Sequence, residues 1–206
     1  TGRARVGKDT VADYLVEAYG FERRAFARGV KEEVAAAFPG AELDPADKES
    51  PQTILALGNC TDPGFVEAAK WCTPSVAHGD PRSYRVIWQL WGTEYRRAQN
   101  QNYWVGRADA WLAERVVAGH RRFVFTDVRF ENERQWITSF REHGARTDVW
   151  HVQRADAPTV AAHASETGLE LMTGETLLLN NAGIEDLRTG VTLALQGNQI
   201  VNTKKR

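Results

Sequence analysis

The sequence predicts an α/β fold in which helices flank a parallel β-sheet. Short apolar runs typical of buried strands, at 122–126, 147–153 and 175–179, alternate with longer segments whose apolar residues recur at helical spacing. Strands that alternate with helices generally pair in parallel, because each helix carries the chain back to the start of the next strand. A length of 206 residues suits a single domain with one hydrophobic core.

The composition narrows the class of protein and of ligand. Hydrophobic residues make up 42% of the chain and charged residues 26%, as in a globular protein. The formal net charge of −1 argues against a nucleic-acid polymer as the partner, since binding along a phosphate backbone usually requires a strong basic excess. A small acidic ligand needs only a local basic pocket.

Few features of the sequence indicate the cellular compartment of the protein. No apolar run approaches the ~18 residues of a membrane span, and no signal-peptide pattern opens the chain. Cys60 and Cys72 are too few for a disulfide framework and fit no zinc-ligand spacing, so we predict free thiols in the reducing cytoplasm. The chain opens at Thr1 and its one methionine is Met172, so we expect residues to be absent from the front.

The first half is predicted to be mostly helical. Its helices are expected at 8–19, 26–38, 83–97 and 102–117, with a weaker helical pattern at 52–57. Gly20 is expected to end the first helix and Pro39-Gly40 the second, because neither glycine nor proline continues a helix well. The acidic segment 41–51 is predicted to be a loop, and 61–82, rich in Pro, Gly and Asp, to be mostly loop.

The second half is predicted to alternate strands and helices. Its strands are the three apolar runs given above, and its helices are expected at 132–143 and 183–195. The first of these strands, at 122–126, is aromatic and stops at Asp127. The tail at 196–206 is polar, ends in Lys-Lys-Arg and is expected to fray.

The strongest chemical signal stands at the start of the chain. Its residues, all candidate nucleotide contacts, are Gly2, Arg3, Ala4, Arg5, Val6, Gly7, Lys8, Asp9 and Thr10. Two glycines that flank four residues and precede a lysine match the spacing of a phosphate-binding P-loop. The glycines let backbone N–H groups point inward, the following helix adds its positive end, and Lys8 supplies a charge for the β- and γ-phosphates. The alternative is a plain helix cap.

One position departs from that pattern. Asp9 stands where serine or threonine usually holds Mg²⁺, and Thr10 follows it. Asp9 could bind Mg²⁺ directly or through water as a hard oxygen ligand, and the Thr10 hydroxyl could meet the α-phosphate. A P-loop also requires a strand before Gly2 to anchor it in the sheet, and we expect the residues of that strand to have been lost from the front.

Six segments together resemble the bacteriophage deoxynucleoside monophosphate kinase family and span most of the chain. They are Gly7-Lys8-Asp9-Thr10-Val11-Ala12, Phe26-Ala27 with Lys31, Gln89-Leu90-Trp91-Gly92-Thr93-Glu94 with Arg96 or Arg97, Asp127-Val128-Arg129-Phe130-Glu131-Asn132-Glu133, His163-Ala164-Ser165-Glu166, and Asn180-Asn181-Ala182-Gly183. The animal-type phosphomevalonate kinases look similar in the P-loop segment. The resemblance implies a P-loop kinase fold with a parallel sheet, a helical acceptor-binding region at about 26–118 and a lid at about 154–170.

Asp127 and Arg129 are predicted to serve the acceptor and the transferred phosphate. Asp127 ends the strand at 122–126, and a carboxylate at the carboxyl edge of a parallel sheet can face Mg²⁺ or the acceptor. Arg129 stands two residues on and can grip a phosphate by two parallel N–H···O bonds. The alternative for Asp127 is a strand-end cap without a chemical role.

Four residues are predicted to line one side of the acceptor pocket: Gln89, Thr93, Glu94 and Arg97. At i, i+4, i+5 and i+8 they share one broad face of an α-helix. The alternative is a solvated face on which Glu94 and Arg97 form only an i,i+3 ion pair. Lys31 is a further candidate, for the acceptor phosphate, although a lysine beside Glu32 and Glu33 is more often an ordinary surface residue.

The lid region offers one cation and one polar motif. Arg154, which ends the strand at 147–153, is the predicted lid arginine that stabilises transferred charge, and Arg3 and Arg5 compete for that role. The segment His163-Ala164-Ser165-Glu166 has residue types found in hydrolases. No third group or oxyanion hole can be placed with it, so we predict that it lies beside the lid.

Four tryptophans gather in the middle of the sequence: Trp88, Trp91, Trp104 and Trp111. They could serve as platforms on which a base stacks. Aromatic residues at helical spacing usually pack inward, so we expect most of them to be core and at most one to touch a base.

The sequence therefore predicts direct transfer of the ATP γ-phosphate to a deoxynucleoside 5′-monophosphate, with Mg²⁺ and without a covalent intermediate. Lys8, Asp127, Arg129 and Arg154 are the predicted catalytic residues. Two alternatives stay open, namely a kinase of another phosphorylated small molecule such as phosphomevalonate, and a module that binds ATP without acting on an acceptor. The expected partners are small nucleotides, with neither nucleic-acid polymer nor membrane, in the host cytoplasm if the chain is phage-encoded. A homodimer is compatible with the sequence.

Overall fold

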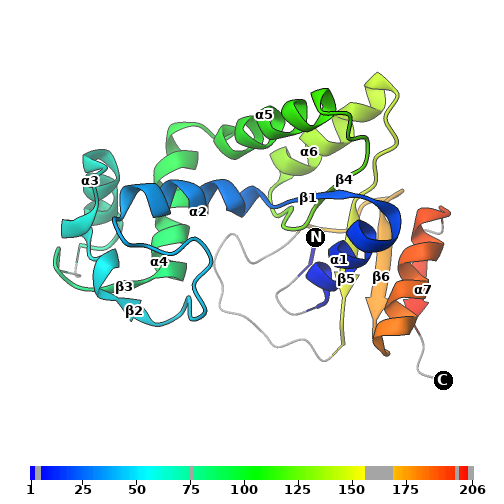
Figure 1. Cartoon of the computed structure of the whole chain (residues 1–206), viewed down its shortest axis with the longest axis horizontal. Coiled ribbons are helices and arrows are strands. Elements are labelled where there is room, and N and C mark those ends of the chain that lie inside the picture. The colour runs from blue at the N-terminus through cyan, green and yellow to red at the C-terminus, as the bar shows by residue number, and fades with distance from the viewer. Residues whose placement is uncertain (3–5, 75–76, 156–168, 198–199, 204–206) are drawn as a thin grey trace. The chain divides into compact units, whose positions relative to one another are not determined.

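The computed structural model describes residues 1–2, 6–74, 77–155, 169–197 and 200–203 (Figure 1). These divide into two compact units. The sheet unit comprises Thr1–Ala25 and Trp111–Arg206, and the helical unit comprises Phe26–Ala110. The helical unit begins at the residue where the acceptor-binding region was predicted to begin, and its binding role stays a prediction.

The strands of the sheet unit that the structure describes pair only in parallel, which confirms the predicted α/β class. β1 (Glu22–Arg24) pairs with β4 (Phe123–Phe125), and β5 (Trp150–Gln153), β6 (Thr176–Asn180) and β7 (Ile200–Thr203) form a second sheet in that order. β4, β5 and β6 are the three strands predicted from apolar runs. The expectation that the tail frays was wrong for residues 200–203, because they pair with β6. The sequence did not predict β1, whose Glu-Arg-Arg has no apolar residue.

Three helices cover the strands of the sheet unit. They are α1 (Lys8–Tyr19), α6 (Glu131–Ser139, continued by the 3-10 helix Phe140–His143) and α7 (Ile184–Leu195), all close to their predicted bounds. α1 ends as predicted, because Gly20 takes a left-handed φ of 67° and donates its N–H to Val16 O at 3.1 Å. α7 lies along β6 and contacts α1 (Figure 1).

The core of the sheet unit holds the start of α1 in place. Its buried members are Val6, Val11, Leu15, Val152, Leu178, Leu187, Val191 and Ala194. Val6 and Val11 lie on either side of the turn into α1, so the same apolar cluster fixes both ends of that turn. Truncating a fully buried member such as Leu178 to alanine costs roughly 2 to 5 kcal/mol of stability in comparable cores.

The helical unit is built from consecutive helices and one short strand pair. Its elements are α2 (Phe26–Ala37), β2 (Pro51–Gln52), the 3-10 helices Thr53–Leu55 and Leu57–Asn59, α3 (Pro63–Cys72), β3 (Arg82–Ser83), α4 (Tyr84–Gln89), the π-helix Leu90–Arg97, and α5 (Tyr103–Val117), whose residues from Trp111 on belong to the sheet unit. β2 and β3 are antiparallel. Phe38, Phe65, Trp91 and Tyr95 pack as an aromatic core, with ring centroids 4.5 to 6.1 Å apart.

Two predictions for this unit were wrong in detail. Residues 61–82 are not mostly loop, because Asp62 caps α3 by accepting from Phe65 N at 2.9 Å and Pro63 takes the first helical position. The helical pattern at 52–57 is realised as two 3-10 turns rather than an α-helix. Cys60 and Cys72 are free thiols, as predicted. Among the helices of the described ranges, none is long and apolar enough to cross a membrane.

Candidate functional site

The glycine–lysine loop, residues 2–8, turns tightly at both of its glycines. Gly2 has a φ of 137°, and a Cβ there would lie 2.3 Å from Val152 O. Gly7 has a φ of 102°, and a Cβ there would lie 2.6 Å from Asn180 Nδ2. Both positions therefore require glycine, for the left-handed backbone and for the space. Lys8 Nζ donates to Gly2 O at 2.8 Å, so the two ends of the loop meet.

Asn180 holds the loop from the far end of β6. Its Nδ2 donates to Val6 O at 2.9 Å, and this buried bond joins residues 174 positions apart. Asn180 is 9% exposed. Among the residues quoted for the family resemblance, it had received no role of its own. The signal that marks Asn180 in the sequence is its place directly after the apolar run 175–179 and three residues before Gly183.

The loop residues Arg3, Ala4 and Arg5 lie outside the described residues, so their predicted roles stay predictions. Asp9 is largely exposed and forms an ion pair with Arg23 of β1, which also pairs with Asp13. No sequence signal marked Arg23. Within the described ranges, no three His, Cys, Asp or Glu side chains gather closely enough to hold a metal ion. Whether Asp9 and Thr10 hold a metal stays a prediction.

The segment between β4 and α6 carries Asp127 and Arg129 and is fixed by one buried carboxylate. Glu133, 1% exposed, accepts from Arg129 N at 2.8 Å and from Phe130 N at 3.2 Å. This caps α6 and sets the direction of the backbone at Arg129. Asp127 is half-buried, and its charge partly offsets the burial that lowers the pKa of the Thr1 α-amino group to about 5, so the two groups lie near each other. Asp127 and the glycine–lysine loop thus belong to one corner of the sheet unit.

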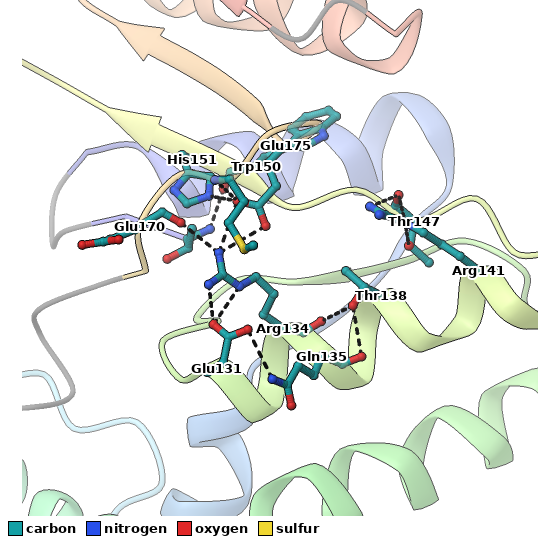
Figure 2. A network of polar contacts seen from close by, with 12 residues as sticks. Glu131, Arg134, Gln135, Thr138, Arg141, Thr147, Trp150, His151, Glu170 and Glu175 are labelled. Carbon is teal, nitrogen blue, oxygen red and sulfur yellow. Dashed lines mark hydrogen bonds and ion pairs between the residues drawn. The ribbon is translucent and has the colours of Figure 1, made fainter.

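A buried polar network joins α6 to β5 and β6 beside this corner (Figure 2). Glu175 Oε2 lies 2.7 Å from His151 Nε2, and Arg134 Nη1 lies 3.4 Å from the same carboxylate. Arg134 also pairs with Glu131 and donates to Glu170 O at 2.8 Å. The network therefore ties the helix that follows Arg129 to the strand that ends before Arg154.

Burial and pairing lower the pKa values of both His151 and Glu175 in this network. Burial lowers the pKa of His151, although the neighbouring Glu175 carboxylate opposes the shift. Burial alone would raise the pKa of Glu175, but the Met172 N–H, His151 and the Arg134 charge outweigh it, and the net pKa is lowered. Both shifts favour a neutral imidazole beside an ionised carboxylate.

Arg154 is exposed and directly follows β5. The lid predicted at about 154–170 is described only at 154–155 and 169–170. His163, Ser165 and Glu166 lie outside the described residues. The role of Arg154 stays a prediction.

In the helical unit, the predicted acceptor residues lie on α2, α4 and the π-helix. Gln89 ends α4, and Thr93, Glu94 and Arg97 belong to the π-helix Leu90–Arg97. The spacing argument assumed an α-helix throughout, whereas Leu90–Arg97 is a π-helix that bonds i to i+5. Whether these residues line an acceptor pocket stays a prediction. Arg97 is 6% exposed and donates from Nη1 to Gln101 O at 3.2 Å.

Lys31 has two nearby partners within the helical unit. Its Nζ donates to Asp44 Oδ1 at 2.6 Å and lies 5.0 Å from the centre of the Trp88 ring. The Lys31 hydrogen bond is the main cause that lowers the pKa of Asp44. Trp91 and Trp104 are core residues as predicted, 1% and 2% exposed.

Glu33 of α2 is a centre of the helical unit that the sequence did not single out. Its carboxylate accepts from Trp91 Nε1 at 2.9 Å, Arg96 Nε at 2.8 Å and Tyr103 OH at 2.7 Å. Three different helices thus meet on one acidic side chain that is 15% exposed. Sequence reasoning could not mark Glu33, because its partners lie 58 to 70 residues away.

Comparison with known proteins gives one family. The model of the deoxynucleotide monophosphate kinase family matches residues 59–191, about two thirds of the chain. The match covers Gln89, Asp127 and Asn180 and does not reach the glycine–lysine loop. A search of curated proteins gives no match. Since the family model covers more than half of the chain, the chain belongs to the deoxynucleotide monophosphate kinase family and is a phosphotransferase.

Proposed function

We propose that this chain transfers the γ-phosphate of ATP to a deoxynucleoside 5′-monophosphate and so forms the diphosphate. The observation that carries the proposal is the glycine–lysine loop: two glycines, each at a position that excludes a side chain, bring Lys8 back to Gly2 O at 2.8 Å. Such a turn before a helix N-terminus directs backbone N–H groups toward an anion.

In this proposal the loop binds the phosphates of ATP. The N-terminus of α1 and the backbone from Val6 on supply N–H donors, and the Lys8 ammonium neutralises charge on the phosphates during transfer. Lys8 can leave Gly2 O for a phosphate oxygen, because a flexible four-carbon stem lets the ammonium reorient. Asn180 keeps the peptide at Val6 in the required orientation.

Asp9 and Thr10 are the residues that would hold Mg²⁺. Oxygen donors suit that ion, which usually keeps several of its waters. Asp9 is exposed on the first turn of α1 and is oriented by Arg23, so it can meet a hydrated ion without burial. Mg²⁺, when bound there, would supply positive charge that lowers the repulsion between the phosphates and an incoming acceptor.

Asp127 and Arg129 are proposed to serve the acceptor in the sheet unit. The Glu133 cap fixes the backbone at Arg129 and Phe130, which reduces the ordering cost when a phosphate is gripped. Lys31, Gln89, Thr93, Glu94 and Arg97 are the proposed acceptor contacts of the helical unit. Arg154 is proposed to stabilise the transferred charge.

The test is release of ADP in a coupled assay, with Mg·ATP and each of the four common deoxynucleoside monophosphates in turn. We expect acceptor-stimulated turnover with at least one of them, and a loss of at least ~100-fold in Lys8→Ala. Lys70→Ala is the matched control, since Lys70 is exposed and pairs only at the surface with Glu67 at 2.8 Å. No turnover with any nucleotide by a folded protein that binds ATP would overturn the proposal.

A further inference from the structure

Two cations of α2 share one carboxylate in the helical unit. Arg28 and Lys31 are three positions apart, so their side chains leave the same side of the helix. Asp44, in the acidic segment that follows α2, accepts from both of them. Its Oδ2 lies 3.0 Å from Arg28 Nη1, and its Oδ1 lies 2.6 Å from Lys31 Nζ. Each oxygen of this carboxylate therefore binds a different cation.

Other contacts keep the two cations in place without Asp44. Arg28 Nε donates to Glu32 Oε1 at 3.1 Å, one turn further along α2. Lys31 Nζ lies 5.0 Å from the centre of the Trp88 ring, and the face of an aromatic ring attracts an ammonium. Both cations thus keep a second partner when Asp44 moves away, so they form a preorganised pair for another anion.

Asp44 can move away at a small cost. Its side chain is 59% exposed, so water solvates the carboxylate as soon as it leaves the cations. The segment around it is fixed at other points, because Tyr84 OH accepts from Glu42 N at 2.7 Å and Lys48 O accepts from Arg85 N at 3.0 Å. Ion pairs between exposed side chains add little to stability. A ligand with more negative charge can therefore replace this carboxylate.

A phosphate monoester is the anion that suits this pair of cations. It carries a charge of about −1.5 to −2 at pH 7, whereas a carboxylate carries a single negative charge. It presents three oxygens, and a guanidinium can bind two of them through parallel N–H groups. Arg28 and Lys31 already hold the two oxygens of one carboxylate, so a phosphate can take the same two donors and exert the stronger attraction.

We propose that Arg28 joins Lys31 in binding the phosphate monoester of the acceptor, and that Asp44 is the internal counter-ion which this phosphate displaces. The inference rests on the proposed function, which already assigns Lys31 to the acceptor. Asp44 lowers the affinity of the site for both the acceptor and the product, since the ester phosphate of either one must replace it. Weaker product binding shortens the time that the product stays bound.

The test measures dissociation constants by isothermal titration calorimetry, at low ionic strength and without ATP. The probes are the four common deoxynucleoside 5′-monophosphates and the four deoxynucleosides that lack the phosphate. The variants of the full chain are Asp44→Asn and Arg28→Gln. Asp47→Asn makes the same charge change in the same segment, where Asp47 accepts from Glu49 N and Ser50 N. Lys70→Gln is the control for Arg28→Gln, since Lys70 is exposed and pairs with Glu67.

We expect Asp44→Asn to lower the Kd of the bound monophosphate about two- to fivefold, because an exposed ion pair is a weak competitor. Arg28→Gln should raise the same Kd at least ~fivefold, since it removes a charged donor. The Kd of the deoxynucleoside, and that of the monophosphate in both controls, should stay within about twofold of wild type. A merely structural role of Asp44 would not tighten binding.

The proposal is overturned by an unchanged or raised Kd in Asp44→Asn, by an equal gain in Asp47→Asn, or by a Kd within about twofold of wild type in Arg28→Gln. Wild-type protein that binds none of the four monophosphates overturns it as well. Failure of the proposed function is seen separately, because the titration contains no ATP. A chain that shows both expected shifts but releases no ADP keeps this phosphate site and loses the proposed reaction.

Discussion

Replacing Asn180 tests whether one buried hydrogen bond sets the shape of the glycine–lysine loop. Asn180→Ala removes the donor at 2.9 Å from Val6 O and leaves that buried carbonyl without its side-chain partner. Leaving a buried polar group unsatisfied costs about 1 to 3 kcal/mol. At roughly 2 to 4 °C per kcal/mol for a chain of this size, the melting temperature should fall by about 2 to 12 °C. Asn180→Asp should cost at least as much, because a carboxylate oxygen would face the carbonyl oxygen.

The assay combines urea denaturation with the KM for ATP. We expect a lower urea midpoint at unchanged slope, and a raised KM for ATP with a smaller change in the KM for the acceptor. Asn181→Ala is the neighbouring control, because Asn181 is exposed and its Oδ1 accepts from Ala155 N at the surface. If Asn180→Ala stayed within ~0.5 kcal/mol of wild type and kept its KM for ATP, the loop would not depend on this bond.

Three further predictions follow from the site. Asp127→Asn should lower kcat far more than it weakens ATP binding, if the carboxylate acts in the transition state, and an unchanged kcat would leave only the capping role. Arg129→Lys should raise the KM for the acceptor and leave the KM for ATP nearly constant, because an ammonium cannot make the two parallel bonds of a guanidinium; a shift of the acceptor KM within about twofold contradicts this. The urea midpoint should fall as pH drops from 7 to 4. His151 has a folded pKa below the usual 6.5 and Glu175 one below 4.5, so the unfolded chain binds more protons at each step, and Glu175→Gln should remove the part of the loss below about pH 5.

Local signals predicted much of the fold. Gly20 stops α1, and apolar runs gave β4, β5 and β6, because these features depend on residues close in sequence. α3 could have been predicted in the same way, since Asp62-Pro63 is a standard helix start. β1 could not, because three polar residues become a strand only through pairing with β4, about 100 positions away.

The candidate site shows the same contrast between features set by neighbouring residues and features set by distant contacts. Gly2, Gly7 and Lys8 are visible as a spacing, because a tight turn before a helix constrains neighbouring residues. The hydrogen bond from Asn180 that holds this turn could not be predicted, because Asn180 and Val6 are 174 positions apart in the sequence. The π-helix Leu90–Arg97 was also not predicted. The pattern of apolar residues was analysed for 3.6 residues per turn, and it does not reveal a local i to i+5 register.

Glu33 shapes how the helical unit can change over generations of mutation. Its carboxylate accepts hydrogen bonds from Trp91, Arg96 and Tyr103 at the same time. A single substitution at Glu33 removes the acceptor of three donors in one step, of which Arg96 keeps an ion pair with Asp62 at 3.6 Å. Losing any one donor still leaves the acid two partners. Substitutions at the donor positions should therefore be tolerated more easily than substitutions at Glu33. Loss of Glu33 during evolution would require that its partners be replaced first.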